Sequence, residues 1–246
     1  MKFEILDGVE IVEGLGLFLR RFDVLVIADL HIGYEAALEK QGITLPKSQY
    51  PKIKKTVEEM IRIVRPKVLI VNGDLKHEFG EATRQEWKET LDFIDFIRSM
   101  GIELIVVRGN HDNFLIPILK KKDVEFKDPS YTLGEFLFIH GHKQLNLESF
   151  KQTIKTIVMA HEHPAIGVRD ELGVRRRFKC FLVGKVYDKN LIVMPALSPL
   201  MPGVEINNVE KDELLSPLLR VADIEEFVAI VYEGGEYFEI PLKEIR

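Results

Sequence analysis

Five short apolar runs in this chain each end, on the C-terminal side, in Asp, Asn or His. In chain order they are VLVIA before Asp29 and His31, VLIVNG before Asp74, LIVVRG before Asn110, His111 and Asp112, FLFI before His140 and His142, and TIVMA before His161 and His163. Six of the seven histidines lie in these termini, and the seventh, His77, comes three residues after Asp74. Apolar runs of this length predict buried strands, so the fold must place polar side chains at the C-terminal end of each of these strands.

Between the first three runs, two stretches have helical periodicity. Their apolar residues fall on one helical face at 51–64 and again at 81–100, where Trp87, Leu91, Ile94 and Ile97 point inward. Strand and helix therefore alternate, which favours a parallel α/β sheet with helices outside. The first 40 residues predict short strands, and after Asp112 strands dominate, with one helix expected at 147–155. We predict a four-layer α/β/β/α sandwich in which two mixed sheets pack face to face between helices.

The polar termini are expected to meet in one crevice. In open α/β sheets, ligands bind outside the carboxyl ends of the strands, so five such ends would pool carboxylate, amide and imidazole groups. Asp29 and His31 are two residues apart, as are His161 and His163. In extended chain, residues at this spacing point to the same side, so each pair can hold one ion or two adjacent ions.

The chemistry of these side chains indicates a metal site. Oxygen and imidazole donors without thiolate disfavour a structural zinc site and suit Mn²⁺, Fe or Zn²⁺ in an open site. There are too many candidate ligands for one tetrahedral ion. Two divalent ions about 3.5–4 Å apart, bridged by a carboxylate, would use them all and would hold the oxygens of a displacement at phosphorus.

Composition argues against several other classes of protein. Hydrophobic residues make up 46% of the 246 and charged residues 30%, which is ordinary for a globular protein with a core. The net charge of −5 argues against a basic protein that coats nucleic acid but leaves room for a local basic groove. Cys180 is the single cysteine, the N-terminus lacks a signal-peptide core, and no apolar run approaches the ~18 residues of a membrane span. We expect a cytoplasmic protein with no membrane partner.

In their order along the chain, the motifs resemble those of the calcineurin-like metallophosphoesterase superfamily. The family pattern is Asp-x-His, Gly-Asp, Gly-Asn-His-Asp or Glu, a lone His, and Gly-His-x-His. This chain has DLH (29–31), GD (73–74), GNHD (109–112), His140 and AHEH (160–163). The resemblance implies one metallophosphoesterase domain over residues 1–246, with the motifs in 29–163 and additional strands in 164–246 completing the second sheet. Ala160 replaces the usual Gly of the last motif without removing a ligand.

The resemblance also implies a role for each motif residue. The implied metal ligands are Asp29, His31 and His163 for one ion, Asn110, His140 and His161 for the second, and Asp74 as a bridge between them. His111 would face the substrate phosphate, with Asp112 orienting its ring. Two divalent ions, Mn²⁺ in the first place and Fe, Zn²⁺ or Ni²⁺ as alternatives, would share a bridging hydroxide that attacks the phosphate ester.

Because of His77, the chain most resembles the small SbcD-related or ICC-like phosphoesterases of archaea. It stands in GDLKHEF where the family commonly has a second acid, and a similar Gly-Asp-Leu-x-His occurs in nuclease subunits of double-strand-break repair. We therefore expect a phosphodiesterase that acts on nucleic acid or nucleotides. The alternatives are a phosphomonoesterase and a non-catalytic interaction module of this fold. A mononuclear metalloprotease is disfavoured because residues 161–163 lack the HExxH spacing.

Some residues near the motifs stay open between two interpretations. His77 either orients a metal ligand or is a satisfied structural histidine, and His142 either supports the lone histidine of the fourth motif or faces solvent. Arg175 and Arg177 follow an expected hairpin turn at Gly173 and either grip phosphates or belong to an ordinary charged hairpin. The stretch SPLMPG (198–203) is open between a cap over the site, a contact in a homodimer and a surface loop.

Overall fold

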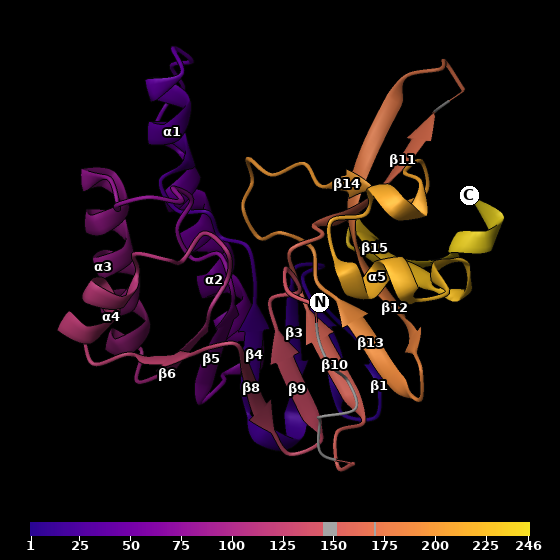
Figure 1. Ribbon diagram of the computed structural model, residues 1–246, viewed down its shortest axis with the longest axis horizontal. Coiled ribbons are helices and arrows are strands. Elements are labelled where there is room, and N and C mark those ends of the chain that lie inside the picture. Colours follow the sequence, from indigo (N-terminus) through magenta and orange to yellow (C-terminus); the bar gives the residue numbers. More distant parts are fainter. Residues whose placement is uncertain (145–151, 170) are drawn as a thin grey trace.

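The computed structural model describes residues 1–144, 152–169 and 171–246 and contains two β-sheets (Figure 1). The first sheet has seven strands in chain order: β1 (Lys2–Leu6), β2 (Val9–Val12), β3 (Gly16–Leu19), β4 (Val24–Ile27), β5 (Val68–Asn72), β6 (Glu103–Val107) and β7 (Glu125–Lys127). Neighbours are antiparallel from β1 to β4 and parallel from β4 to β7. The sheet is therefore mixed, and its parallel part carries the first three polar termini.

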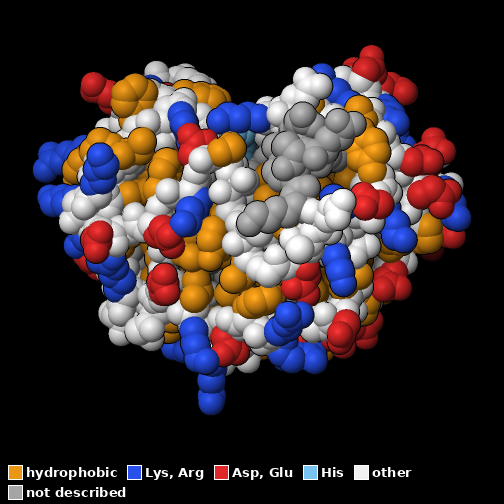
Figure 2. Space-filling view, turned by 60° about the horizontal axis from the view of Figure 1, so that its bottom comes forward, with side chains coloured by type: hydrophobic (Ala, Val, Ile, Leu, Met, Phe, Trp, Pro, Cys, Tyr) orange, Lys and Arg blue, Asp and Glu red, His pale blue; other side chains and the backbone are white. Residues whose placement is uncertain are grey.

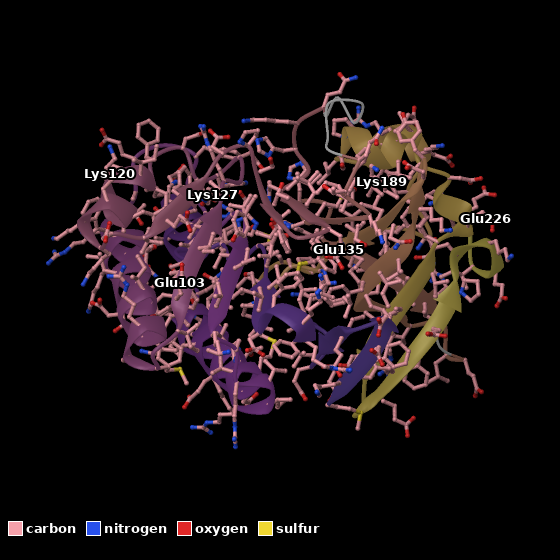
Figure 3. The ribbon with its side chains drawn as sticks, turned by 90° about the horizontal axis from the view of Figure 1, so that it is seen from below. Glu103, Lys120, Lys127, Glu135, Lys189 and Glu226 are labelled. Carbon is pink, nitrogen blue, oxygen red and sulfur yellow. The ribbon has the colours of Figure 1, made fainter. Side chains whose placement is uncertain are left out.

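The second sheet is also mixed. Its spatial order is β14 (Val204–Glu205), β11 (Pro164–Arg169), β12 (Arg175–Val186), β13 (Lys189–Val193), β10 (Thr156–Met159), β9 (Phe136–Ile139) and β8 (Ser130–Leu133), while β15 (Val228–Glu233) and β16 (Glu236–Pro241) extend it from β12. Strands β9, β10 and β13 run parallel, so the last two polar termini leave the sheet at one edge. Glu103 at the start of β6 and Lys189 at the start of β13 lie on opposite halves of the molecule in Figure 3.

Three apolar clusters hold the layers together. On one side of the first sheet, α2 (Gln49–Val64), α3 (Arg84–Ser99) and α4 (Ile116–Lys121) pack against strand residues such as Leu69 and Val71 (Figure 1). Ile70, between them in β5, points the other way and packs with Phe138 and Phe181 of the second sheet. On the far face of the second sheet lies α5 (Pro217–Val221). The predicted four-layer α/β/β/α order is confirmed.

The helices predicted at 51–64 and 81–100 are confirmed, with adjusted ends. The first begins at Gln49 and ends at Val64, where Arg65 takes the left-handed conformation before Pro66. The second begins only at Arg84, because Thr83 and Glu86 form a capping box in which each side chain accepts the backbone N–H of the other.

Other parts of the chain differ from the prediction. The first 40 residues contain a helix, α1 (Tyr34–Lys40), that the strand pattern did not indicate. Most of the helix expected at 147–155 lies outside the described residues, and residues 152–155 lead into β10 without a helix. Short 3₁₀ helices occur at Arg20–Phe22, Lys211–Glu213, Ile224–Glu226 and Leu242–Glu244. None of the helices in the described ranges combines the length and apolar composition that crossing a membrane requires.

Candidate functional site

The polar residues leave their strands through left-handed backbone turns. Positive φ angles of 47° to 70° occur at Asp29, His31, Asp74, His161 and His163. The expectation of extended chain in the two His-containing pairs is therefore wrong. A left-handed conformation costs roughly 1–2 kcal/mol at a residue with a side chain. Cross-strand hydrogen bonds offset this cost, since Asp29 N donates to Gly73 O at 3.1 Å and His31 N donates to Asp74 O at 2.9 Å.

These turns gather the expected metal ligands into two adjacent clusters, and a third group in the described residues, made of His31, His77 and His111, shares His31 with the first of them. The first contains Asp29, His31 and His163, and the second contains Asp74, His140 and His161; in each, one ligand atom per residue lies within 4.8 Å of the others. The two histidines of the last motif thus go to different clusters. Asn110 joins the second cluster, because its Oδ1 lies 2.9 Å from His140 Nε2. All seven residues expected to bind metal are brought together.

The Asp74 carboxylate lies between the clusters. Its Oδ2 is 3.1 Å from His140 Nε2 in one cluster and 3.8 Å from His31 Nε2 in the other. Its Oδ1 accepts a hydrogen bond from the backbone N–H of His111 at 2.9 Å. A single buried carboxylate therefore reaches both groups of imidazoles.

Two glycines allow this close approach. A Cβ at Gly73, where φ is +93°, would overlap the His140 ring, and a Cβ at Gly109 would overlap Asp74 Oδ1. Space beside the clusters thus requires glycine at both positions, and at Gly73 the left-handed backbone favours it as well.

The donor set fits a divalent cation. Asp29 Oδ1 is buried and accepts no hydrogen bond from any residue in the described part of the chain; His163 Nε2 is 3.3 Å away. A buried carboxylate oxygen without a donor is costly unless a cation compensates it. With carboxylate, amide and imidazole groups converging on this point, the residues suit a hard or borderline metal ion.

Burial and charge set the protonation of the cluster residues. Burial lowers the pKa of His31 to about 3 and that of His161 to about 4, so both rings are neutral near pH 7, as metal ligands must be. The pKa of His140 behaves in the opposite way: burial lowers it, but the adjacent Asp74 carboxylate raises it to about 9. A proton on His140 thus compensates negative charge at the position where a bound cation would do so.

His111 and Asp112 lie beside the clusters and make different contacts. The His111 ring is 13% exposed, and its Nε2 lies 3.9 Å from Asp74 Oδ2. Its Nδ1 contacts the backbone carbonyl of His77; because a carbonyl can only accept, Nδ1 carries the proton and donates it.

Asp112 does not orient the His111 ring, and that expectation is wrong. Its buried carboxylate instead accepts four backbone N–H groups, from Asp74 and Gly109 at 2.9 Å, Leu75 at 3.0 Å and Lys76 at 3.4 Å. Asp112 therefore joins the GNHD turn to the loop that carries Asp74. The physical reason is geometric: consecutive residues of a turn point in different directions, so the Asp112 side chain faces away from its neighbour's ring.

His77 and His142 both lie near the clusters. His77 Nδ1 is 3.3 Å from His31 Nδ1, so this ring supports a cluster histidine while its carbonyl holds His111. The centroid of the His142 ring lies 5.3 Å from that of His140 and 6.0 Å from that of His161. Both rings therefore lie near the clusters, and the two interpretations given for the role of each stay predictions.

Arg175 and Arg177 are not brought to the clusters. Both lie on β12, in the hairpin that extends beyond the body in Figure 1, and both pair with Glu205 of β14, a carboxylate only 5% exposed. Arg177 also donates to the Gly203 carbonyl at 3.0 Å. On the face drawn in Figure 2, cationic and anionic side chains are interspersed, without one continuous basic patch. A phosphate-binding role for these arginines stays a prediction.

Several supporting residues escaped the sequence analysis. Asn72, at the end of β5, donates to the carbonyls of Ile139 at 2.9 Å and Val158 at 3.2 Å, which ties the first sheet to β9 and β10 at the site. Its position at the polar end of an apolar run was the available signal. This link explains why motifs from different sheets meet.

A second support comes from residues 196–203. Ser198 N donates to Asp29 O at 3.1 Å, and Ser198 Oγ accepts from Gln49, whose amide also donates to His31 O at 2.9 Å. Lys179 Nζ donates to the carbonyls of residues 196 and 198. The SPLMPG stretch therefore begins against the site, while its roles as a cap or dimer contact stay predictions. No local pattern in the sequence marks Gln49 or Lys179.

Comparison with solved structures shows the same fold in a bacterial nuclease. The structure described as Pseudomonas putida nuclease MPE is similar with a TM-score of 0.67 and 17% identity over 98% of this chain and 99% of that one. YfcE, a phosphoesterase from E. coli, is similar with a TM-score of 0.41 and 13% identity over 91% and 94% of the two chains. None of the curated proteins matches this chain.

A family model places the chain more directly. The model described as "Calcineurin-like phosphoesterase" matches residues 22–187, a span that includes every motif and both clusters. The narrower resemblance to the small archaeal proteins stays a prediction. Together with the fold and the gathered Asp and His ligands, the match shows that this chain belongs to the calcineurin-like phosphoesterase family, hydrolases of phosphoester bonds that bind divalent metal.

Proposed function

We propose that this phosphoesterase is a dinuclear-metal phosphodiesterase acting on nucleic acid or nucleotides. The observation that carries the proposal is the position of Asp74, whose Oδ2 lies 3.8 Å from a histidine of one cluster and 3.1 Å from a histidine of the other. A carboxylate within reach of two donor sets is what a pair of bridged ions needs.

In this proposal each cluster holds one ion. The ligands are Asp29, His31 and His163 for the first ion, Asn110, His140 and His161 for the second, and Asp74 for both. The orphaned Asp29 Oδ1 and the neutral rings of His31 and His161 support the assignment. Mn²⁺ is the proposed metal, with Fe, Zn²⁺ and Ni²⁺ as alternatives, because the donors are oxygen and imidazole and the single cysteine, Cys180, is buried in the second-sheet core.

The ions and His111 divide the chemistry. When bound, two divalent ions would activate a water molecule near neutral pH and neutralise charge on the phosphate. His111 acts at the leaving oxygen, on the side of the phosphate opposite the attacking water. Its Nδ1–H is held by the His77 carbonyl, which fixes the ring with Nε2 toward the cluster. When the ring is protonated, the N–H at Nε2 stabilises charge on the phosphate and protonates the leaving oxygen.

The preference for diesters rests on two supports. His77, which stands where a second acid is common, contacts both a cluster histidine and His111. The solved structure with the same fold is described as a nuclease. A phosphomonoesterase is the alternative within the family.

The cytoplasm is the proposed compartment, since the single cysteine cannot form an internal disulfide.

A substrate panel with metal-free protein tests the proposal. After chelation, Mn²⁺ is added back, and hydrolysis of bis-p-nitrophenyl phosphate, p-nitrophenyl phosphate and single-stranded DNA is compared. We expect the diester and the DNA to be cleaved faster than the monoester. Faster cleavage of the monoester would establish the alternative, and protein that takes up none of Mn²⁺, Fe²⁺, Zn²⁺ and Ni²⁺ in calorimetry and cleaves no substrate would be a non-catalytic module.

Replacing His111 separates metal binding from catalysis. His111→Gln should retain two Mn²⁺ per chain while kcat falls about 10²- to 10⁴-fold, the usual contribution of a general acid. Asp95→Asn is the matched control, because Asp95 pairs with Lys122 on the surface of α3. Full activity of the His111 variant would show that this residue has another role.

A further inference from the structure

Phe79 is an exposed aromatic residue beside the buried clusters. Its side chain is 53% exposed, yet its ring stacks on that of His111 with a centroid separation of 3.7 Å and an angle of 28°. Singly exposed apolar residues are common and need no explanation. A phenylalanine stacked on the histidine proposed to face the leaving oxygen is a different case, because whatever lies against its open side also lies next to the scissile bond.

Four rings form a row that ends at Phe79. After the Phe79–His111 pair come His77, 5.2 Å from His111 at 32°, and Tyr34, 4.0 Å from His77 at 33°. The Phe79–His111 pair is stacked, and the other two pairs are tilted by 32° and 33°. A further flat ring could extend this row at its exposed Phe79 end, with the offset face-to-face contact that aromatic groups favour.

The loop that carries Phe79 is fixed on both sides by buried charges. Lys76, which is fully buried, donates through Nζ to the carbonyls of Glu78 and Gly80, the two neighbours of Phe79. The equally buried Glu86 carboxylate accepts the backbone N–H of His77 at 3.1 Å and that of Glu78 at 2.6 Å. Burying an ammonium and a carboxylate is costly unless each is hydrogen-bonded, and here both bond to the loop backbone and hold it in place.

The result is a preorganised flat surface. A side chain held in its binding position before the ligand arrives loses little conformational entropy on binding, which increases affinity. The nearest chemistry is a phosphate site, and the flat group attached one sugar away from a phosphodiester is a nucleobase. Stacking suits any base, because every base has a π-face.

We propose that Phe79 is a specificity-determining residue that stacks the nucleobase on the leaving-group side of the scissile phosphodiester. This inference rests on the proposed phosphodiesterase function and names the part of the substrate that the site recognises. The base lies on the open face of Phe79 while His111, on the other face, holds the leaving oxygen. Substrates that lack a base lose this contact and keep all contacts with the phosphate.

Kinetics on two matched oligonucleotides test the inference. One is a single-stranded decamer of thymidylate, and the other is a decamer of abasic tetrahydrofuran residues with the same backbone, both assayed with Mn²⁺-loaded protein. Phe79→Leu should lower kcat/KM on the thymidylate decamer about 5- to 150-fold, the range that stacking of one base supplies. On the abasic decamer its effect should stay within about twofold, and Phe79→Trp should retain the preference for bases.

Phe238→Leu is the control, because Phe238 is 46% exposed on β16 and lies outside the ring row. Mn²⁺ content and the urea midpoint should be equal in all variants. An equal loss on both decamers would show that Phe79 acts only by packing on His111, and an unchanged kcat/KM on both would show that it contacts no base; either result overturns the inference. Wild-type protein that cleaves neither decamer nor bis-p-nitrophenyl phosphate would overturn the proposed function itself, and the inference with it.

Discussion

Replacing Asp112 with Asn should destabilise the protein far more than a change of one atom usually does. The two Asp112 oxygens accept from different backbone pairs: Oδ2 from Asp74 N and Gly109 N, and Oδ1 from Leu75 N and Lys76 N. The amide of Asn offers one oxygen and one NH₂ group. Whichever way it turns, two buried N–H groups then face a donor.

The expected magnitude follows from those two N–H groups. A buried donor left without an acceptor costs about 1–3 kcal/mol, so the loss is about 2–6 kcal/mol. Proteins of this kind are stable by about 5–15 kcal/mol, so the variant should be folded but clearly weakened. In either orientation a lost acceptor holds the backbone of residues 74–76, which carries the Asp74 ligand, so Mn²⁺ affinity should fall as well.

Urea unfolding of metal-free protein, followed by circular dichroism, measures the effect directly. Asp95→Asn is the control, since Asp95 is 57% exposed and a surface change is expected to alter stability by no more than about 0.5 kcal/mol. Titration with Mn²⁺ in native buffer gives the change in affinity. An Asp112→Asn midpoint equal to that of the control would refute the role assigned to the four hydrogen bonds.

Three further predictions concern other parts of the molecule. Burial raises the pKa of Glu89 to about 7, so the folded chain holds a proton there that the unfolded chain releases above about pH 4.5, and the free energy of unfolding should fall between pH 4.5 and 7. Glu89→Gln should remove this loss and stabilise the protein by about 1–2 kcal/mol at pH 8, whereas identical pH profiles of the two proteins in thermal unfolding would contradict the prediction. Gly109→Ala should abolish binding of the second Mn²⁺ in calorimetry, since its Cβ overlaps Asp74 Oδ1; two ions bound would show that the turn can adjust. Chelation should lower the unfolding temperature, because an ion at a hundred times its Kd adds about 2.7 kcal/mol; no shift on chelation would indicate that metal is not held in the folded state.

The polar strand ends were the part of the site most accessible from sequence. Apolar runs such as residues 24–28 and 156–160 identify strands, and parallel strands present their carboxyl ends at one edge. That reasoning brings Asp29 and His161 to the same crevice, where His161 N indeed donates to Asp29 Oδ2 at 3.2 Å. The helices were predictable for the same reason, because one periodic apolar face packs on each sheet.

Backbone conformation and long-range hydrogen bonds were not accessible in this way. Left-handed turns at Asp29 and His31 are selected by partners such as Gly73, more than 40 residues along the chain, which a local pattern does not contain. The same holds for Asp112, whose carboxylate reaches N–H groups 36 to 38 residues away in sequence. Spacing shows which residues arrive at the site; the contacts of each side chain depend on turns that only the folded chain defines.

The helix α1 illustrates a tertiary effect of another kind. Its seven residues follow a motif turn, and its buried residue Glu35 accepts the N–H groups of Ser48 and Gln49 at the start of α2. A helix of this length is marginal by itself and is stabilised by such contacts. The apolar pattern of the first 40 residues, read for strands, carried no signal for it.

A crystal of the protein grown with Mn²⁺ and measured at a wavelength where manganese scatters anomalously tests the central claim most directly. We expect two anomalous peaks about 3.5–4 Å apart. One should lie among Asp29, His31 and His163 and the other among Asn110, His140 and His161, with the Asp74 carboxylate between them. A single peak, or manganese bound away from Asp74, would contradict a bridged pair of ions at the meeting point of the two sheets.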